Sequence, residues 1–313
     1  MLKYLKIFLH NECNFHCISC QDSFTKEPSP HSEVLATEEI AKLVDGFARL
    51  GVEHVRIIGG EPLLREDILD FIYMISSAGR IKQISLTTNG FCLKDKALAL
   101  KGAGLNRVNI YLSSLDKVKF KKITGVDGLN RVLEGICAAK EADISPIRIN
   151  VSLVKGLNFD ELEDFATLSI LYPLDIRFIE YCSDFTNPAN SRNVSVLGYV
   201  AKNNIEFVFG KLIPEKANAN EGPATYYRIK DARGRIGFIN PVTEFFCVNC
   251  NAAMLYNDGR LFPCLCSSAY IDLAGLLRSG EYKVLAERIR NCFVAKPQVN
   301  KYTKIEDLQA YMP

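Results

Sequence analysis

The sequence predicts an α/β fold, in which a partial (βα)6 barrel of the TIM type precedes a smaller C-terminal α+β module. Short apolar runs rich in β-branched residues alternate with segments of helical periodicity through residue 181, as buried parallel strands and their crossover helices do. Only six such units occur, too few to close an eight-stranded barrel, and the pattern then changes. The predicted strands are residues 4–9, 54–59, 81–87, 107–112, 147–153 and 174–181.

Helical segments connect these strands. The first begins with Thr37-Glu38-Glu39, the pattern of a capped N-terminus. Because strand–helix–strand connections are right-handed, the strands should run parallel, with their carboxyl ends at the face where such barrels carry their chemistry. The predicted helices are residues 37–50, 65–78, 94–101, 129–140 and 160–171.

A different pattern follows, so we divide the chain into a core of residues 1–182 and a C-terminal module of residues 183–313. Segment 183–204 is polar and has the composition of a linker, and segment 215–223 resembles it. Beyond them the sequence predicts strands at 226–229 and 235–239 and helices at 273–278, 282–292 and 305–311.

Composition argues against several kinds of partner. The 313 residues include 38 basic and 36 acidic ones, for a formal net charge of +2. No overall field therefore draws the chain to a nucleic acid polymer or an anionic membrane. Lys3 and Lys6 interrupt the apolar N-terminus, and no run reaches the roughly 18 apolar residues of a membrane-spanning helix. We expect a cytoplasmic protein with neither a membrane nor a nucleic acid polymer as partner.

Three cysteines form a group directly after the first predicted strand. Cys13, Cys17 and Cys20 have the spacing C-x3-C-x2-C, on a loop at that strand's carboxyl end. Three thiolates can hold three irons of a 4Fe–4S cluster and leave the fourth iron open to a small molecule. A zinc site is the alternative, but His16 is adjacent to Cys17 and poorly placed as a fourth ligand.

A second group of cysteines lies near the end of the chain. Cys247 and Cys250 are separated by two residues, and Cys264 follows after a predicted hairpin with an Asp-Gly turn at residues 258–259. The hairpin should bring Cys250 and Cys264 back together. The alternative to an iron–sulfur cluster is a zinc site with Cys266 as the fourth ligand.

These features resemble the radical S-adenosylmethionine (SAM) superfamily. Gly59-Gly60-Glu61-Pro62 follows the second strand like the family's GGEP motif, and segment 87–90 follows the third like its TNG segment. The two glycines would let backbone approach the ligand, and a carboxylate suits its ammonium group. The resemblance implies that SAM binds the open iron and is cleaved reductively to a 5′-deoxyadenosyl radical, which abstracts a hydrogen atom from a substrate. The implied SAM contacts are Gly59, Gly60, Glu61, Thr88, Asn89 and Asn150.

Almost the whole chain also resembles the MoaA family, the GTP 3′,8-cyclases of molybdenum-cofactor biosynthesis. Segments 120–125, 131–136, 177–181 and 236–239 carry this likeness. It implies a second, auxiliary 4Fe–4S cluster in a "twitch" module, with the substrate between the two clusters. It also implies an electron donor of the flavodoxin or ferredoxin type, and it is compatible with a homodimer. The implied ligands of the second cluster are Cys247, Cys250 and Cys264, and the implied substrate contacts are Arg65 and Arg177.

The chain departs from that family in three places. The family's C-N-R-x-R-L pattern reads C-N-A-A-M-L at residues 250–255, the Gly-Gly tail is replaced at residues 310–313, and Tyr111 stands where the family has a serine of its SAM site. Since a triphosphate needs fixed cations, we predict a MoaA-like radical SAM enzyme whose substrate is an altered nucleotide, a nucleoside or a peptide. The alternatives are an authentic GTP 3′,8-cyclase and a non-catalytic, degenerate metal-binding scaffold.

Overall fold

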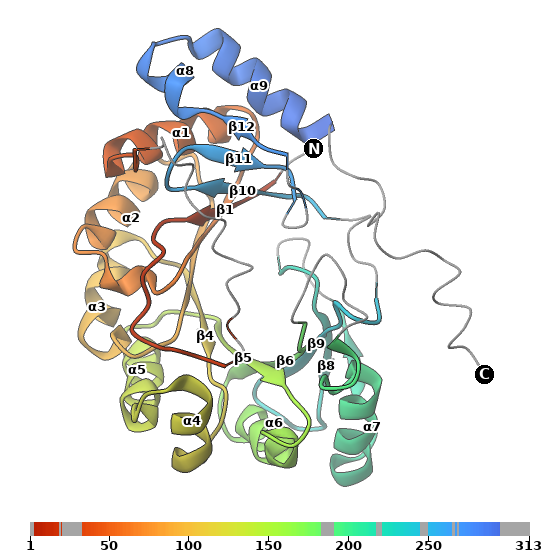
Figure 1. Ribbon diagram of the computed structural model, residues 1–313. Coiled ribbons are helices and arrows are strands. Elements are labelled where there is room, and N and C mark those ends of the chain that lie inside the picture. The colour runs from red at the N-terminus through yellow and green to blue at the C-terminus, as the bar shows by residue number, and fades with distance from the viewer. Residues whose placement is uncertain are drawn as a thin grey trace.

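The structure is a computed structural model that describes residues 3–18, 20, 33–182, 191–216, 221–244, 250–264, 267 and 269–294. Within these residues one sheet has the strand order β12-β11-β10-β1-β2-β3-β4-β5-β6-β9-β8-β7. Figure 1 shows this sheet as an open curve with helices on its outer side. The α/β prediction is confirmed.

Six parallel strands form the centre of the sheet, in chain order. They match the six predicted strands to within two residues at either end. The strands are β1 Tyr4–Phe8, β2 His54–Ile58, β3 Gln83–Thr88, β4 Arg107–Tyr111, β5 Ile147–Leu153 and β6 Leu174–Glu180. The helices between them are α1 Thr37–Arg49, α2 Ile68–Ser77, α3 Leu93–Ala103, α4 Lys117–Thr124, α5 Leu129–Glu141 and α6 Leu162–Leu171.

The C-terminal part of the chain extends the same sheet at both edges. Strand β10 pairs in parallel with β1, whereas β9 pairs in parallel with β6. The sheet therefore continues across the boundary that we predict after residue 182, and that boundary stays a prediction. The elements of this part are α7 Gly198–Phe209, β7 Ile213–Glu215, β8 Thr225–Arg228, β9 Arg235–Ile239, β10 Ala252–Tyr256, β11 Arg260–Phe262, β12 Ile271–Asp272, α8 Ala274–Arg278 and α9 Tyr282–Val294.

The two faces of the sheet differ in chemistry because alternate residues of a strand point to opposite sides. The outer face is apolar, and its side chains join those of the helices in one continuous core; examples are Leu5, Val55, Leu86, Ile110, Ile149 and Ile176. The residues between them, on the inner face, are mostly polar or charged. We call the space that this inner face lines the lumen.

The structure differs from the prediction in three segments. Helix α4 was not expected, because its eight residues bury only Phe120, Ile123 and Thr124. The prediction of a linker over residues 183–204 is wrong for its last residues, because α7 begins at Gly198. The helix expected from Arg65 begins at Ile68, because the short 3-10 helix η2 Pro62–Leu64 precedes it.

Other predictions for the C-terminal part hold. The hairpin of β10 and β11 forms around residues 257–259 as predicted, and α8 and α9 lie within two residues of their predicted bounds. The helix predicted at 305–311 lies outside the described residues. Among the helices that the structure describes, none has the length and apolar character needed to cross a membrane.

Candidate active site

The first three cysteines lie on the loop after β1, at the carboxyl edge of the parallel strands. Cys13 and Cys17 are partly buried and Cys20 is exposed. Burial, together with the neighbouring thiols of Cys20 and Cys13, raises the pKa of Cys17 to about 12. Among the described residues the side chains are not yet gathered as a metal site would need, but neighbouring thiolates repel one another, and a bound cation would keep all three ionised. Three thiol donors on one loop fit an iron–sulfur cluster with one open iron.

Helix α4 holds this loop in place. The backbone N–H of His16 donates to the carbonyl oxygen of Thr124 at 2.8 Å. The N–H of Ile18 donates to the carbonyl oxygen of Ile123, also at 2.8 Å. The last turn of the helix is therefore bonded to residues on both sides of Cys17.

The two glycines of the GGEP segment lie directly under the cysteine loop. A Cβ at Gly59 would meet the carbonyl oxygen of His10 at 2.2 Å, and one at Gly60 would meet that of Glu12 at 2.2 Å. The backbone N–H of Gly60 also donates to the His10 carbonyl oxygen at 2.7 Å. The glycines therefore allow the loop itself to pass close to β2, a reason that the sequence did not reveal.

Glu61 links the ends of β2 and β3. Its carboxylate is fully buried and accepts hydrogen bonds from the Thr88 hydroxyl at 2.7 Å, the Asn89 N–H at 2.6 Å and the Leu63 N–H at 3.0 Å. Burial raises the pKa of this carboxyl, although these hydrogen bonds oppose the rise. The side-chain amide of Asn89 also reaches the Cys13 sulfur at 3.8 Å. The predicted residues of both motifs thus meet at the first cysteine, but the Glu61 oxygens already have backbone and hydroxyl donors.

Tyr111, Asn150 and Arg177 form a row across three strands near the same edge. Tyr111 is the register partner of Asn150, and Asn150 is that of Arg177. The Arg177 guanidinium is buried and donates to the amide oxygens of Asn150 and Asn109. By contrast, Tyr111 is 47% exposed although it ends a buried strand. The row offers a fixed cation and a partly exposed phenol to a ligand, and the protein around that phenol is close enough for burial to raise its pKa.

A second row on the inner face is strongly basic. Lys6, Arg56, Ser85 and Arg107 are successive register partners on β1 to β4, and Met254 of β10 is the neighbour of Lys6 on the other side. Among the described residues, Nε and Nη2 of Arg56 and Nε of Arg107 are buried without a hydrogen-bond partner. Burying unpartnered guanidinium nitrogens is costly, so this row suits an anionic ligand.

A third row contains the acids that neutralise part of this charge. Arg148 of β5 donates to Glu221 at 2.5 Å, and Arg235 of β9 donates to Asp175 at 2.6 Å and to Glu221 at 2.8 Å. Two carboxylates are thus shared by two arginines. The basic residues of the second row and Arg177 stay uncompensated by carboxylates within hydrogen-bond reach in the described part of the chain.

Among these basic residues, the sequence alone points only to Arg177 as a substrate contact. Each of them is a basic residue in an otherwise apolar strand, with its side chain on the inner face of the sheet. This shared placement can be recognised only once the pairing of the strands is known. The residues that were missed are Lys6, Arg56, Arg107, Arg148 and Arg235.

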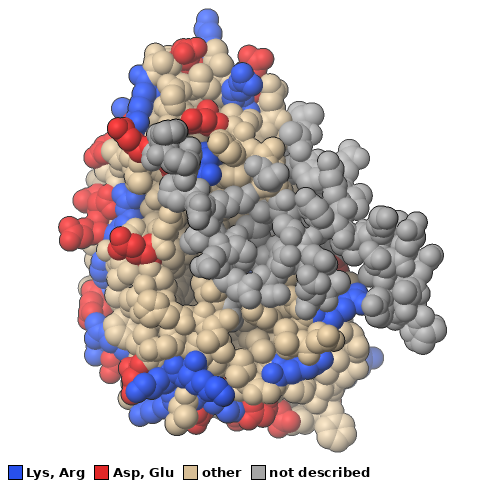
Figure 2. Space-filling view, viewed as in Figure 1, with Lys and Arg blue, Asp and Glu red and all other residues tan. Residues whose placement is uncertain are grey.

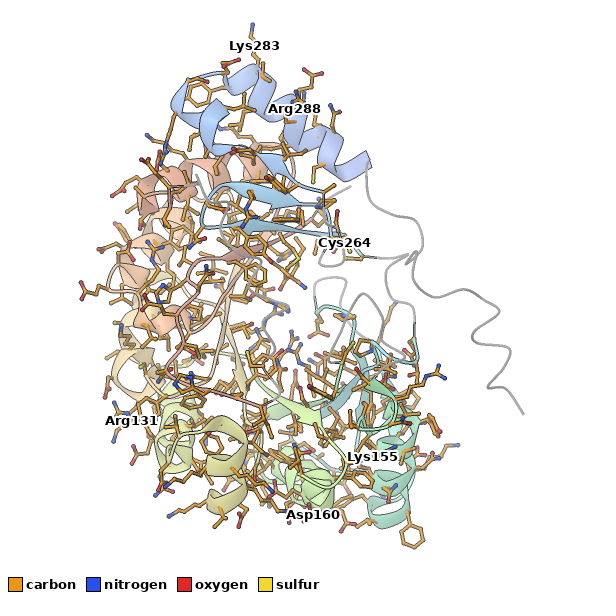
Figure 3. All side chains as sticks on the ribbon, in the orientation of Figure 1. Arg131, Lys155, Asp160, Cys264, Lys283 and Arg288 are labelled. Carbon is orange, nitrogen blue, oxygen red and sulfur yellow. The ribbon has the colours of Figure 1, made fainter. Side chains whose placement is uncertain are left out.

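Two cysteines of the second group lie at the opposite end of the lumen. Cys250 precedes β10, which runs parallel to β1, and Cys264 follows β11 (Figure 3). Burial and the charge of Arg56 lower the pKa of Lys6, and the thiols of Cys250 and Cys264 lie near enough to oppose this shift. Cys247 and Cys266 lie outside the described residues. The pair fits part of a thiolate ligand set, and the lumen lies between it and the first group.

Arg65 is held outside these rows. Its guanidinium donates to the Asp67 carboxylate at 2.6 and 2.7 Å, to the Thr37 hydroxyl at 2.7 Å and to the Leu9 carbonyl oxygen at 3.0 Å. These bonds fasten the end of β1 to α1 and to the start of α2. Its contact with substrate stays a prediction.

Comparison with family models identifies the class of protein. The model of the radical SAM superfamily matches residues 7–168, and that of Molybdenum Cofactor Synthesis C matches residues 174–302. The chain belongs to the radical SAM superfamily, and it is an enzyme that uses SAM and two 4Fe–4S clusters.

Comparison with individual relatives identifies the family within this superfamily. A GTP 3′,8-cyclase of Thermodesulfovibrio yellowstonii is 41% identical over 306 residues, covering 97% of this chain and 94% of that enzyme. Another, of Peptoclostridium acidaminophilum, is 39% identical and covers 90% of this chain and 85% of that enzyme. Within the superfamily, the chain belongs to the GTP 3′,8-cyclase (MoaA) family.

Solved structures agree on the fold. Streptococcus suis SuiB bound to S-adenosylmethionine has a TM-score of 0.63 at 16% identity, covering 93% of this chain and 68% of that one. The native anSMEcpe structure with bound AdoMet has a TM-score of 0.61 at 14% identity, covering 96% of this chain and 84% of that one. At such identities the likeness concerns architecture only.

Proposed function

We propose that the protein is a GTP 3′,8-cyclase, which joins C3′ of the ribose to C8 of the guanine of GTP. The observation that carries this proposal is the basic row of Lys6, Arg56 and Arg107, together with Arg177. These residues line the lumen between the two groups of cysteines, and no carboxylate of the described residues pairs with them. The names of the relatives point to the same substrate.

Electrostatics favours a polyanion at this place. The lumen carries more guanidinium and ammonium groups than carboxylates, and most of them are shielded from water, where a charge interacts more strongly with its partner. A triphosphate placed there would supply the acceptors that Arg56 and Arg107 lack. The chain's own residues would therefore bind and orient the nucleotide while the sheet excludes water from it.

The residues at the carboxyl edge would hold the cofactor. Cys13, Cys17 and Cys20 would bind the first cluster, and Cys250 and Cys264 would share in binding the second. When bound, SAM and the first cluster would supply the radical chemistry that takes a hydrogen atom from the substrate. Asn89 donates to the Cys13 sulfur, and such donors tune the reduction potential of a cluster.

One observation favours the altered substrate that the sequence predicts. Where the family has its second arginine, Met254 packs in a small apolar cluster with Phe8, Tyr256 and Phe262. The rings of Phe8 and Tyr256 are stacked with centroids 4.4 Å apart. The β1–β10 side of the lumen therefore carries an apolar patch beside Lys6, and a nucleotide that differs from GTP in its base or sugar is the second candidate.

The test is turnover of the anaerobically reconstituted protein with SAM and GTP, followed by mass spectrometry. A 3′,8-cyclised GTP product supports the proposal, and Arg56→Met should lower its yield at least tenfold. The control is Arg233→Met, which removes an exposed arginine. Formation of 5′-deoxyadenosine with GTP unchanged would favour the second candidate, and binding of zinc without SAM cleavage would contradict both.

A further inference from the structure

One helix places a charged surface directly on the loop of the first cysteines. The exposed face of α4 consists of Lys117, Val118, Lys121 and Lys122, which lie within about 140° of one another around the helix. We call this the α4 face. Figure 2 shows Lys and Arg side chains gathered over this helix, in the lower part of the view.

The α4 face is basic. Segment 116–127 holds four lysines and two aspartates, a net charge of +2, which equals that of the whole chain of 313 residues. Lys119 is turned away toward Asp160 (labelled in Figure 3), and Lys121 has Asp127 at 3.6 Å. Lys117 and Lys122 form no salt bridge within the part of the chain that is described. A positive surface with free lysine charges suits an acidic protein.

The opposite face of the helix contacts the cluster-binding loop. Phe120 packs edge-to-face on Phe15, with centroids 5.9 Å apart. The helix carbonyls of Ile123 and Thr124 bond to residues on both sides of Cys17, as described above. A protein bound to the α4 face would thus be separated from Cys17 by the helix, one hydrogen bond and one neighbouring residue of the loop.

The loop also contributes to the outer surface. Ile18 is 53% exposed and Val118 is 76% exposed, and His16 is exposed as well. Apolar side chains bordered by lysines make a surface that fits a protein interface better than a solvated helix face. Substrate would enter the lumen, on the inner side of the sheet, so the α4 face stays open while substrate is bound.

We propose that the α4 face is the docking surface for a small acidic protein that carries one electron at a time, of the flavodoxin or ferredoxin class. One electron leaves the reduced flavin or iron–sulfur centre of that carrier, which is oxidised by one unit, and the first cluster is reduced by one unit. The inference rests on the reductive chemistry of the family and not on GTP as substrate. It is therefore tested without GTP.

The experiment compares holoprotein variants in anaerobic stopped flow. Lys117→Gln, Lys121→Gln and Lys122→Gln are combined in one variant, and reduction of the first cluster is followed after mixing with flavodoxin hydroquinone or reduced ferredoxin. The matched control removes three exposed lysines elsewhere and combines Lys42→Gln, Lys211→Gln and Lys230→Gln. Iron content and reduction by dithionite are measured for both variants.

We expect the α4 variant to be reduced by the carrier proteins about tenfold more slowly at low salt, with dithionite reduction and iron content unchanged. Its affinity for oxidised flavodoxin should fall by a similar factor, and its reduction rate should depend less on salt concentration than that of the wild type. Equal rates for the α4 variant and the wild type, or equal losses in the α4 and control variants, would overturn the proposal.

A second variant separates docking from folding. Lys117→Glu reverses a charge in the first turn of α4, where the helix dipole favours a carboxylate. If the triple variant loses iron, the docking proposal is tested with Lys117→Glu alone. It should slow reduction by the carrier proteins severalfold with full iron content, and an unchanged rate would overturn the proposal. We expect the rate of SAM cleavage with dithionite as reductant to be the same in the variants and the wild type. This test is therefore independent of the proposed substrate.

Discussion

Arg177 and Asn150 are joined by two hydrogen bonds across β6 and β5, in which Nε and Nη2 of the guanidinium donate to one amide oxygen at 2.8 and 2.6 Å. The arginine is buried and fixed in direction, yet no carboxylate of the described residues opposes its charge: three of its hydrogen bonds go to amide oxygens, the third to Asn109, and the Tyr226 phenol lies beside it. An arginine oriented by neutral partners keeps its full charge for a ligand.

Asn150→Asp tests this arrangement. The new carboxylate would form a salt bridge with Arg177 and cancel its charge, so the affinity for GTP should fall about tenfold in anaerobic calorimetry. The control is Asn204→Asp, on the exposed side of α7. An unchanged GTP affinity in Asn150→Asp would show that the ligand does not reach this row. SAM affinity is measured in parallel, because Asn150 is also a predicted SAM contact.

Tyr111→Ser tests the phenol at the end of β4. The side chain is 47% exposed and lies next to Asn150 in the row that borders the first cysteines. A serine leaves an open space there, so substrate and cofactor should be held less closely. We expect SAM cleavage to continue while the yield of product per 5′-deoxyadenosine falls roughly threefold to tenfold. Tyr73→Ser on exposed α2 is the control, and an unchanged yield in Tyr111→Ser would assign the phenol no part in positioning.

The lowered pKa of Tyr4 leads us to expect that nucleotide binding depends on pH. Burial acts to raise its pKa, but the charges of Arg56, Arg107 and Lys6 outweigh it and bring the pKa to about 8. Below pH 8 the phenol is neutral, and above it the phenolate cancels one positive charge of the basic row. GTP affinity should therefore decrease as the pH rises through about 8, by roughly threefold to tenfold. In Tyr4→Phe this decrease should disappear, and its persistence would exclude Tyr4 as the source.

Gly60→Ala tests the contact between the GGEP segment and the cysteine loop. A methyl group there would lie 2.2 Å from the Glu12 carbonyl oxygen, so the loop must shift. We expect incorporation of the first cluster to fall by more than half, measured as iron per protein, together with a clear loss of thermal stability. Gly46→Ala is the matched control, because nothing lies within 4 Å of that position in α1. It should leave iron content unchanged and stabilise the protein by about 0.5–1 kcal/mol.

The sequence predicted the central strands well because buried parallel strands are unusually rich in β-branched residues. Strand β5 was predicted at its observed bounds, Ile147–Leu153. Helix α4 escaped prediction because it is short and four of its eight residues are lysines, which gives little apolar periodicity. Helix α7 was assigned in part to a linker because Asn203 and Asn204 lie inside it, and asparagine is more common in turns.

The candidate site was predicted where spacing along the chain encodes it. The cysteines and the GGEP and TNG segments are local patterns, so the sequence alone locates them. The basic row is different, because Lys6, Arg56 and Arg107 are each roughly 50 residues apart and become neighbours only through strand register. No local rule assigns a lone basic residue in an apolar strand to such a row, and only the paired sheet reveals it.

The order of the strands also bears on how the protein is made. β1 leaves the ribosome long before its neighbour β10, which begins only at Ala252. Until then the nascent chain presents an uncovered edge at β1, and another at β6 until β9 has emerged. Such edges attract other strands. Chaperones that shield them and late insertion of iron after release would both favour correct maturation, and a chain cut short before β10 should be a substrate for proteases.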